Sequence, residues 1–111
     1  MTEPAMETVD SFGMSAERAF ADTWSRDILS VRERRLILIS LLVGQGIDDQ
    51  LEVQLDTALR AGELSECELR EVVVFLTHYA GWTRGSRLNT QVEDLIERVR
   101  QDRSGRRDHR G

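Results

Sequence analysis

Two copies of the pattern Ser-x-x-Glu, Ser30 to Glu33 and Ser65 to Glu68, constrain the fold of this chain more than any other feature. In such a capping box the Ser side chain accepts a hydrogen bond from the backbone N–H of the Glu. The Glu side chain in turn accepts one from the backbone N–H of the Ser. Each pattern therefore marks the start of a helix, and the chain is expected to be built from helices.

Apolar residues recur at helical spacing behind each start signal. A strand through Val72 to Val74 is an alternative, but the box before this run and Gly81 after it favour a helix. One Pro and few aromatic residues also argue against a multi-stranded β fold. The expected helices span residues 16–26, 30–43, 48–61, 65–79 and 88–100, with a loop over 82–87. We predict an all-α subunit of five to six helices.

The segment Leu36–Val43 is apolar nearly all round, interrupted only by Ser40. A helix of that kind must be covered on most sides, and 111 residues offer little material to do so. We therefore expect a homo-oligomer. The predicted organisation is a mobile N-terminal arm over 1–14, one all-α domain over 15–100 and an Arg-rich flexible tail over 101–111.

Several classes of protein are disfavoured by composition. The single Cys67 excludes an internal disulfide, a CxxC redox pair and a cysteine zinc site. With only His78 and His109 as histidines, no metal site is expected. No basic-then-apolar leader opens the chain and no apolar run could span a bilayer, so we expect a cytoplasmic protein without membrane contact.

Charge is unevenly distributed along the chain. Residues 1–97 carry a net charge of −9, whereas residues 98–111 carry +4, and every fixed positive side chain is an Arg. The acidic body disfavours nucleic acid as a partner. The basic tail could touch phosphate, although a solvated terminus explains its composition as well.

Glu68 and Tyr79 are the first candidates for chemistry. At 100° per residue they fall close to one line on their helix, together with Val72 and Phe75. On a buried stripe, desolvation would raise the pKa of the Glu68 carboxyl and suit it to general acid or base catalysis. Plain helix capping by Glu68 and a core role for Tyr79 are the competing interpretations.

Gln54 lies at the edge of an apolar stripe, where its amide could orient a ligand carbonyl or serve only as a structural hydrogen-bonding group. His78 could carry a proton or simply interact with the last carbonyls of its helix. Arginine clamps and aromatic walls suit a planar carboxylate. The candidates for substrate binding are Trp24, Arg26, His78, Trp82 and Arg84.

Four stretches together resemble the carboxymuconolactone decarboxylase family, a branch of the alkylhydroperoxidase D-like superfamily, over about Phe20 to Val99. They are Trp24-Ser-Arg26 with Leu29-Ser-Val-Arg32-Glu-Arg34; the apolar helix Leu36–Val43; Leu51-Glu-Val-Gln54 leading into Ala58–Gly62; and Leu64-Ser-x-x-Glu68-Leu-Arg-Glu71-Val leading into Tyr79-Ala-Gly81-Trp82.

The resemblance implies an all-α subunit that assembles as a homotrimer or homohexamer, with pockets near subunit contacts. It implies either cofactor-free decarboxylation of a lactone acid or thiol peroxidase chemistry. Ile47 and Gln50 occupy the two cysteine positions of the peroxidase branch, which excludes that activity here. Gln54 stands at the family's His position, and an amide cannot exchange a proton at neutral pH.

Three functions follow from these residues. The first is a decarboxylase-like, cofactor-free lyase acting on a small oxygenated cyclic or aromatic acid or lactone, with Glu68, Tyr79 and Gln54 as its catalytic residues. The second is a non-catalytic ligand-binding or structural oligomer of the same fold. The third, a nucleic-acid or partner-binding module that uses the Arg-rich tail, is the one that the acidic body favours least.

Overall fold

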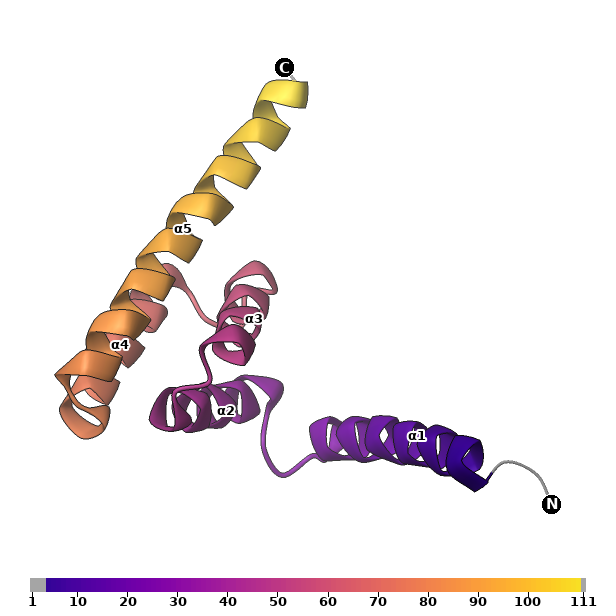
Figure 1. Ribbon diagram of the computed structural model, residues 1–111. Coiled ribbons are helices and arrows are strands. Elements are labelled where there is room, and N and C mark those ends of the chain that lie inside the picture. The colour runs from indigo at the N-terminus through magenta and orange to yellow at the C-terminus, as the bar shows by residue number, and fades with distance from the viewer. Residues whose placement is uncertain (1–3, 111) are drawn as a thin grey trace.

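The computed structural model describes the backbone of residues 4–110 and the side chains of residues 15–106. Its five helices are α1 (Pro4–Ser25), α2 (Val31–Gln45), α3 (Asp48–Arg60), α4 (Glu66–Ala80) and α5 (Trp82–Arg110). Residues 4–110 contain no strand, which confirms the all-α prediction (Figure 1). The run Val72 to Val74 lies inside α4, so its interpretation as a strand is wrong.

Both capping boxes form as predicted. The Ser30 hydroxyl accepts from the Glu33 N–H at 3.0 Å, and the Glu33 carboxylate accepts from the Ser30 N–H at 2.8 Å. The corresponding distances for Ser65 and Glu68 are 3.1 and 2.9 Å. At the end of α2, Gly46 takes a left-handed conformation with φ of 70° and its N–H returns to Leu42 and Val43.

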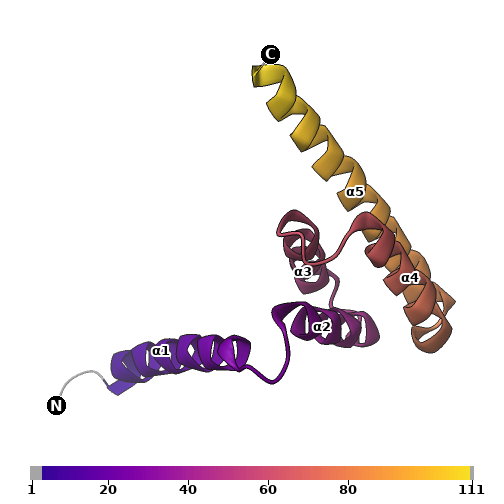
Figure 2. The same cartoon turned by 180° about the vertical axis from the view of Figure 1, so that it is seen from behind.

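Helices α4 and α5 form an antiparallel hairpin, and α2 and α3 lie together against one side of it (Figures 1 and 2). Helix α2 contributes one face to the core they share, while Ile37 and Leu41 on another face remain 57% and 52% exposed. The buried apolar residues are Ile39, Leu42, Val43, Leu51, Leu55, Ala58, Leu59, Leu64, Leu69, Val73, Leu88, Val92, Leu95, Ile96 and Val99.

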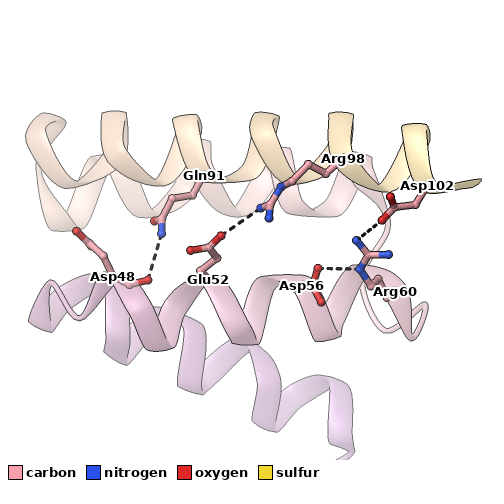
Figure 3. A network of polar contacts seen from close by, with 7 residues as sticks. All are labelled: Asp48, Glu52, Asp56, Arg60, Gln91, Arg98 and Asp102. Carbon is pink, nitrogen blue, oxygen red and sulfur yellow. Dashed lines mark hydrogen bonds and ion pairs between the residues drawn. The ribbon is translucent and has the colours of Figure 1, made fainter.

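A polar seam joins α3 to α5 at the edge of that core (Figure 3). Gln91 donates to the Asp48 carbonyl at 3.2 Å, and Arg98 pairs with Glu52 at 3.3 Å. Farther along, Arg60 bridges Asp56 and Asp102, at 2.8 Å to each. These contacts fix α3 alongside the middle of α5.

The turn between α4 and α5 is tighter than predicted. The loop expected over 82–87 is wrong, because Gly81 ends α4 with φ of 97° and α5 begins at the next residue. The Gly85 N–H donates to the Gly81 carbonyl at 2.9 Å, which closes the first turn of α5.

Both ends of the chain are more helical than predicted. The backbone is helical from Pro4, so α1 begins before the predicted residue 16 and includes much of the segment 1–14 assigned to a mobile arm, and α5 continues to Arg110, beyond its predicted end at residue 100. The pairing of Arg100 with Glu66 and of Asp102 with Arg60 ties α5 to the body near its predicted end at residue 100. No helix of the described backbone has both the length and the apolar character needed to cross a membrane.

Candidate functional site

A pocket of about 370 Å³ lies between α4 and the first turns of α5. Its walls are mostly apolar, with hydroxyl, amide and imidazole groups among the lining side chains. The lining residues are Val73, Val74, Thr77, His78, Trp82, Gly85, Ser86 and Asn89. Apolar walls carrying a few polar groups are typical of small-molecule sites, and the volume falls within their usual range of roughly 300–1,000 Å³.

Close packing of α5 on α4 forms the floor of this pocket. Gly85 is buried against Thr77, and a Cβ atom at position 85 would lie 2.2 Å from the Thr77 Oγ1 atom and 2.7 Å from its Cβ atom. Thr77 is itself buried, and its hydroxyl donates to the Val73 carbonyl at 2.6 Å. Glycine is therefore required at position 85 for the two helices to approach this closely.

His78 is the one lining residue with an ionisable side chain. Its Nδ1 atom lies 2.8 Å from the Val74 carbonyl oxygen. Because a carbonyl only accepts hydrogen bonds, Nδ1 carries the proton, and in the neutral ring Nε2 is the acceptor. The ring orientation is thus fixed by its own helix, and Nε2 is left to interact with a ligand.

Arg35 organises a second cluster, which contains two of the predicted site residues. Its guanidinium pairs with Glu63 at 2.7 and 3.2 Å, donates to the Gln54 carbonyl oxygen and lies 4.6 Å from the centroid of the Trp24 ring. The Arg35 and Glu63 side chains are only 11% and 17% exposed. Residues from α1, α2, α3 and the α3–α4 turn therefore meet at a single cation.

Glu68 lies outside both groups, at the start of α4. Its carboxylate accepts from the Ser65 N–H and pairs with Arg32 of α2, and its side chain is 44% exposed. The backbone hydrogen bond from Ser65 and then the Arg32 guanidinium hold the pKa of the Glu68 carboxyl below its ordinary value. The expectation that burial raises this pKa is wrong, because the face of α4 that carries Glu68 is not buried: Phe75 and Tyr79 on the same line are 58% and 78% exposed.

The other predicted site residues are dispersed over the surface. Tyr79 contacts Phe75 in a tilted arrangement with ring centroids 5.0 Å apart and is 78% exposed, so it is not a core residue of the single chain. Arg84 donates to the Gly44 carbonyl and bridges α5 to the end of α2. Arg26 is exposed in the turn after α1.

The structure thus brings Trp24 together with Gln54, and His78 together with Trp82. The proposed catalytic residues Glu68, Tyr79 and Gln54 each have a different neighbour: Arg32, Phe75 and Arg35. Cys67 is exposed. Among the side chains of residues 15–106, no group of three His, Cys, Asp or Glu residues is placed to hold a metal ion.

Sequence reasoning missed Arg35, Glu63, Ser86 and Asn89. Arg35 had a usable signal, because it directly precedes the apolar run of α2, where a charged group needs a partner. Ser86 and Asn89 had none, because their place in the pocket depends on α5 beginning at Trp82.

Comparison with known proteins identifies no relative of this chain: no family model, no curated protein and no solved structure matches it.

Proposed function

We propose that the protein is a cofactor-free, decarboxylase-like lyase that acts on a small oxygenated cyclic or aromatic acid or lactone. The observation that carries this proposal is the α4–α5 pocket, where an oriented imidazole lies beside apolar walls. Its volume of about 370 Å³ is suited to a single substituted ring. The resemblance of four sequence stretches to the carboxymuconolactone decarboxylase family supports the same chemistry, and assembly as a homotrimer or homohexamer.

The reaction needs little from the protein. When the carbon–carboxylate bond breaks, the electron pair enters the unsaturated lactone and gives a dienolate, which then takes up a proton on carbon. The protein has to bind the acid, stabilise the enolate oxygen and supply that proton. In the α4–α5 pocket, Ser86 and Asn89 would hydrogen-bond to the oxygens and Trp82 would stack on the ring. His78, which holds one proton on Nδ1, would take up a second proton from water at Nε2 and deliver it to the carbon of the dienolate.

This proposal gives the proton-transfer role to His78. Glu68 is bound by Ser65 and Arg32 and is held ionised, which disfavours it as an acid near neutral pH. Gln54 cannot exchange a proton at that pH, and its amide oxygen already accepts a hydrogen bond from the Arg35 guanidinium. An imidazole can both accept and release a proton near neutral pH.

A second candidate, a non-catalytic ligand-binding or structural oligomer, is favoured by the Arg35 cluster. The Arg35 guanidinium is already bound by the Glu63 carboxylate, the Gln54 amide and the Trp24 ring. A substrate carboxylate would have to displace Glu63 from the Arg35 guanidinium. Such a filled cluster joins helices together, and it offers no group that transfers protons.

Turnover of an unsaturated, carboxylated γ-lactone separates the two candidates. Loss of the lactone absorbance should be followed together with CO2 release, in the parent protein and in His78→Gln. Glu71→Gln is the matched control, because it makes an acid-to-amide change at an exposed position of α4 outside the pocket. The lyase proposal predicts a loss of at least about 100-fold in kcat for His78→Gln and parent activity for Glu71→Gln.

Three outcomes would contradict the lyase proposal. One is a His78→Gln variant that turns over lactone at the parent rate. Another is saturable binding of the acid in calorimetry without any CO2 release, which would instead support the ligand-binding candidate. The third is decarboxylation that appears only after Gln54→His, because the parent protein would then have a different function.

A further inference from the structure

The single chain is too extended and too exposed for a compact protein of its length. The radius of gyration is 17.9 Å, whereas about 13 Å is expected for 111 residues. The accessible surface is 8245 Å², whereas a compact monomer of 12.7 kDa exposes about 6,200 Å². The excess of roughly 2,000 Å² is larger than the ~800 Å² that one partner contributes to a standard interface.

Helix α1 accounts for much of this extension, because it projects away from the other four helices (Figures 1 and 2). Phe20 and Trp24 lie one turn apart on α1, with ring centroids separated by 5.8 Å. Phe20 is 64% exposed. Arg18 and Asp22 lie on the opposite side of the helix, whereas Glu17 borders the two aromatic side chains. The aromatic face of α1 is therefore largely uncovered and has an acidic edge.

Two further apolar stripes are uncovered on the body. Ile37 and Leu41 form one on α2, and Phe75 and Tyr79 form the other on α4; all four side chains are more than half exposed. The two helices are neighbours, since α2 and α4 pack on one core and Arg32 of α2 pairs with Glu68 at the start of α4. We call these four residues the α2–α4 apolar face.

The direction of α1 is fixed by contacts at its base. The Trp24 ring is held against the Arg35 guanidinium, and Arg34 donates to the Leu29 carbonyl in the connection that follows. Because these contacts hold both ends of the short connection, α1 points away from the body of its own chain and its Phe20 face stays exposed. A second copy of the chain offers a complementary apolar surface.

We propose that α1 is exchanged between two copies of this chain, with its Phe20 face packed on the α2–α4 apolar face of the other copy. This contact buries the Phe20 face of α1 and the α2–α4 apolar face against each other. A two-fold axis between the two copies produces the same contact a second time. The inference rests on the self-association included in the proposed function and names the element responsible for it. Of the two assemblies given there, it requires the homohexamer built from dimers, because a homotrimer has no two-fold axis. It requires no catalytic activity.

Photo-crosslinking of the full chain tests the exchange directly. The residue p-benzoylphenylalanine should be placed at Phe20 in one variant and at Arg18, on the opposite side of α1, in the control. Equal amounts of ¹⁴N- and ¹⁵N-labelled chains should be mixed, allowed to exchange and irradiated. Mass spectrometry of the crosslinked peptides then shows whether the two halves come from different chains.

We expect the Phe20 variant to give covalent dimers with mixed isotope labels, joined to peptides that contain residues 37–41 or 75–79. The Arg18 control should give at least about fivefold fewer. Crosslinks confined to one isotope, or an equal yield from both positions, would overturn the proposal.

Light scattering of Phe20→Asp gives an independent test. The substitution should lower the parent's molar mass to that of a smaller assembly or a monomer, with the helical circular dichroism signal retained. An unchanged mass would count against the exchange. Lactone turnover is not part of either readout, so a failed decarboxylation assay leaves this inference standing, and a failed crosslink leaves the lyase proposal standing.

Discussion

Replacement of Gly85 by Ala tests the closest helix contact in the structure. The new Cβ atom would lie 2.2 Å from the Thr77 Oγ1 atom, 2.7 Å from its Cβ atom and 2.8 Å from its Cγ2 atom, whereas ordinary contacts begin at 3.4 Å. Thr77 cannot rotate away from all three contacts, because one of them is with its own Cβ atom. Helix α5 must therefore move relative to α4.

The expected loss of stability follows from two opposing effects. Overpacking of this severity costs about 3 kcal/mol, while replacing Gly by Ala inside a helix restores up to about 1 kcal/mol. The net loss in the free energy of unfolding is then about 2 kcal/mol. For a domain of this size that corresponds to a decrease in Tm of roughly 10 °C.

Gly105→Ala is the matched control, because it makes the same substitution in the same helix with no atom within 4 Å of the new Cβ. It should raise stability by up to about 1 kcal/mol. Urea unfolding followed by circular dichroism, at one fixed subunit concentration, measures both variants. Combining Gly85→Ala with Thr77→Ala should recover part of the loss, because two of the three contacts disappear. Equal stability of Gly85→Ala and Gly105→Ala would refute the packing of α5 on α4 described above.

Three further predictions concern polar contacts. Ser65→Ala should cost about 1 kcal/mol in urea unfolding, and an unchanged midpoint would show that this capping box contributes nothing. A double-mutant cycle of Arg35→Met and Glu63→Gln should give a coupling energy of about 1–3 kcal/mol, since the pair is largely buried; additive effects would remove the ion pair from the stability of the fold. The Ser65 and Arg32 contacts hold the pKa of Glu68 in the folded protein below its ordinary value of 4.5, so its stabilisation is present above that value and is lost as the pH falls through the folded pKa. Glu68→Gln should therefore lose less stability than the parent on acidification below about pH 4.5, and identical pH profiles would contradict the Ser65 and Arg32 contacts.

The helices of the body could be predicted from sequence because their signals are local. The two Ser-x-x-Glu boxes place the starts of α2 and α4 correctly, and helical spacing identifies the core residues of α5 from Leu88 to Val99. A capping box acts within four residues, so it needs no tertiary contact to be recognised.

The site depended on contacts between segments that are distant in the sequence. Glu68 was placed correctly on α4, and its pKa is lowered first by the local hydrogen bond from the Ser65 N–H, but the second cause is Arg32, which lies 36 residues away. Gln54 was singled out correctly as a polar group on an apolar stripe, whereas its partner Arg35 belongs to another helix. The α4–α5 pocket depends on the tight turn at Gly81, which the predicted loop over 82–87 did not anticipate.

The sequence by itself determined that this protein is helical, where its central helices begin and which of their faces are apolar, because these properties depend on neighbours within one or two turns. Only the tertiary structure decided that the Glu68 carboxylate is bound by Arg32, that Arg35 joins Trp24 to Gln54, and that His78 shares a pocket with Trp82 and Asn89. The physical reason is that an ion pair or a pocket exists only once the packing of helices has brought separate segments to within a few ångströms of one another.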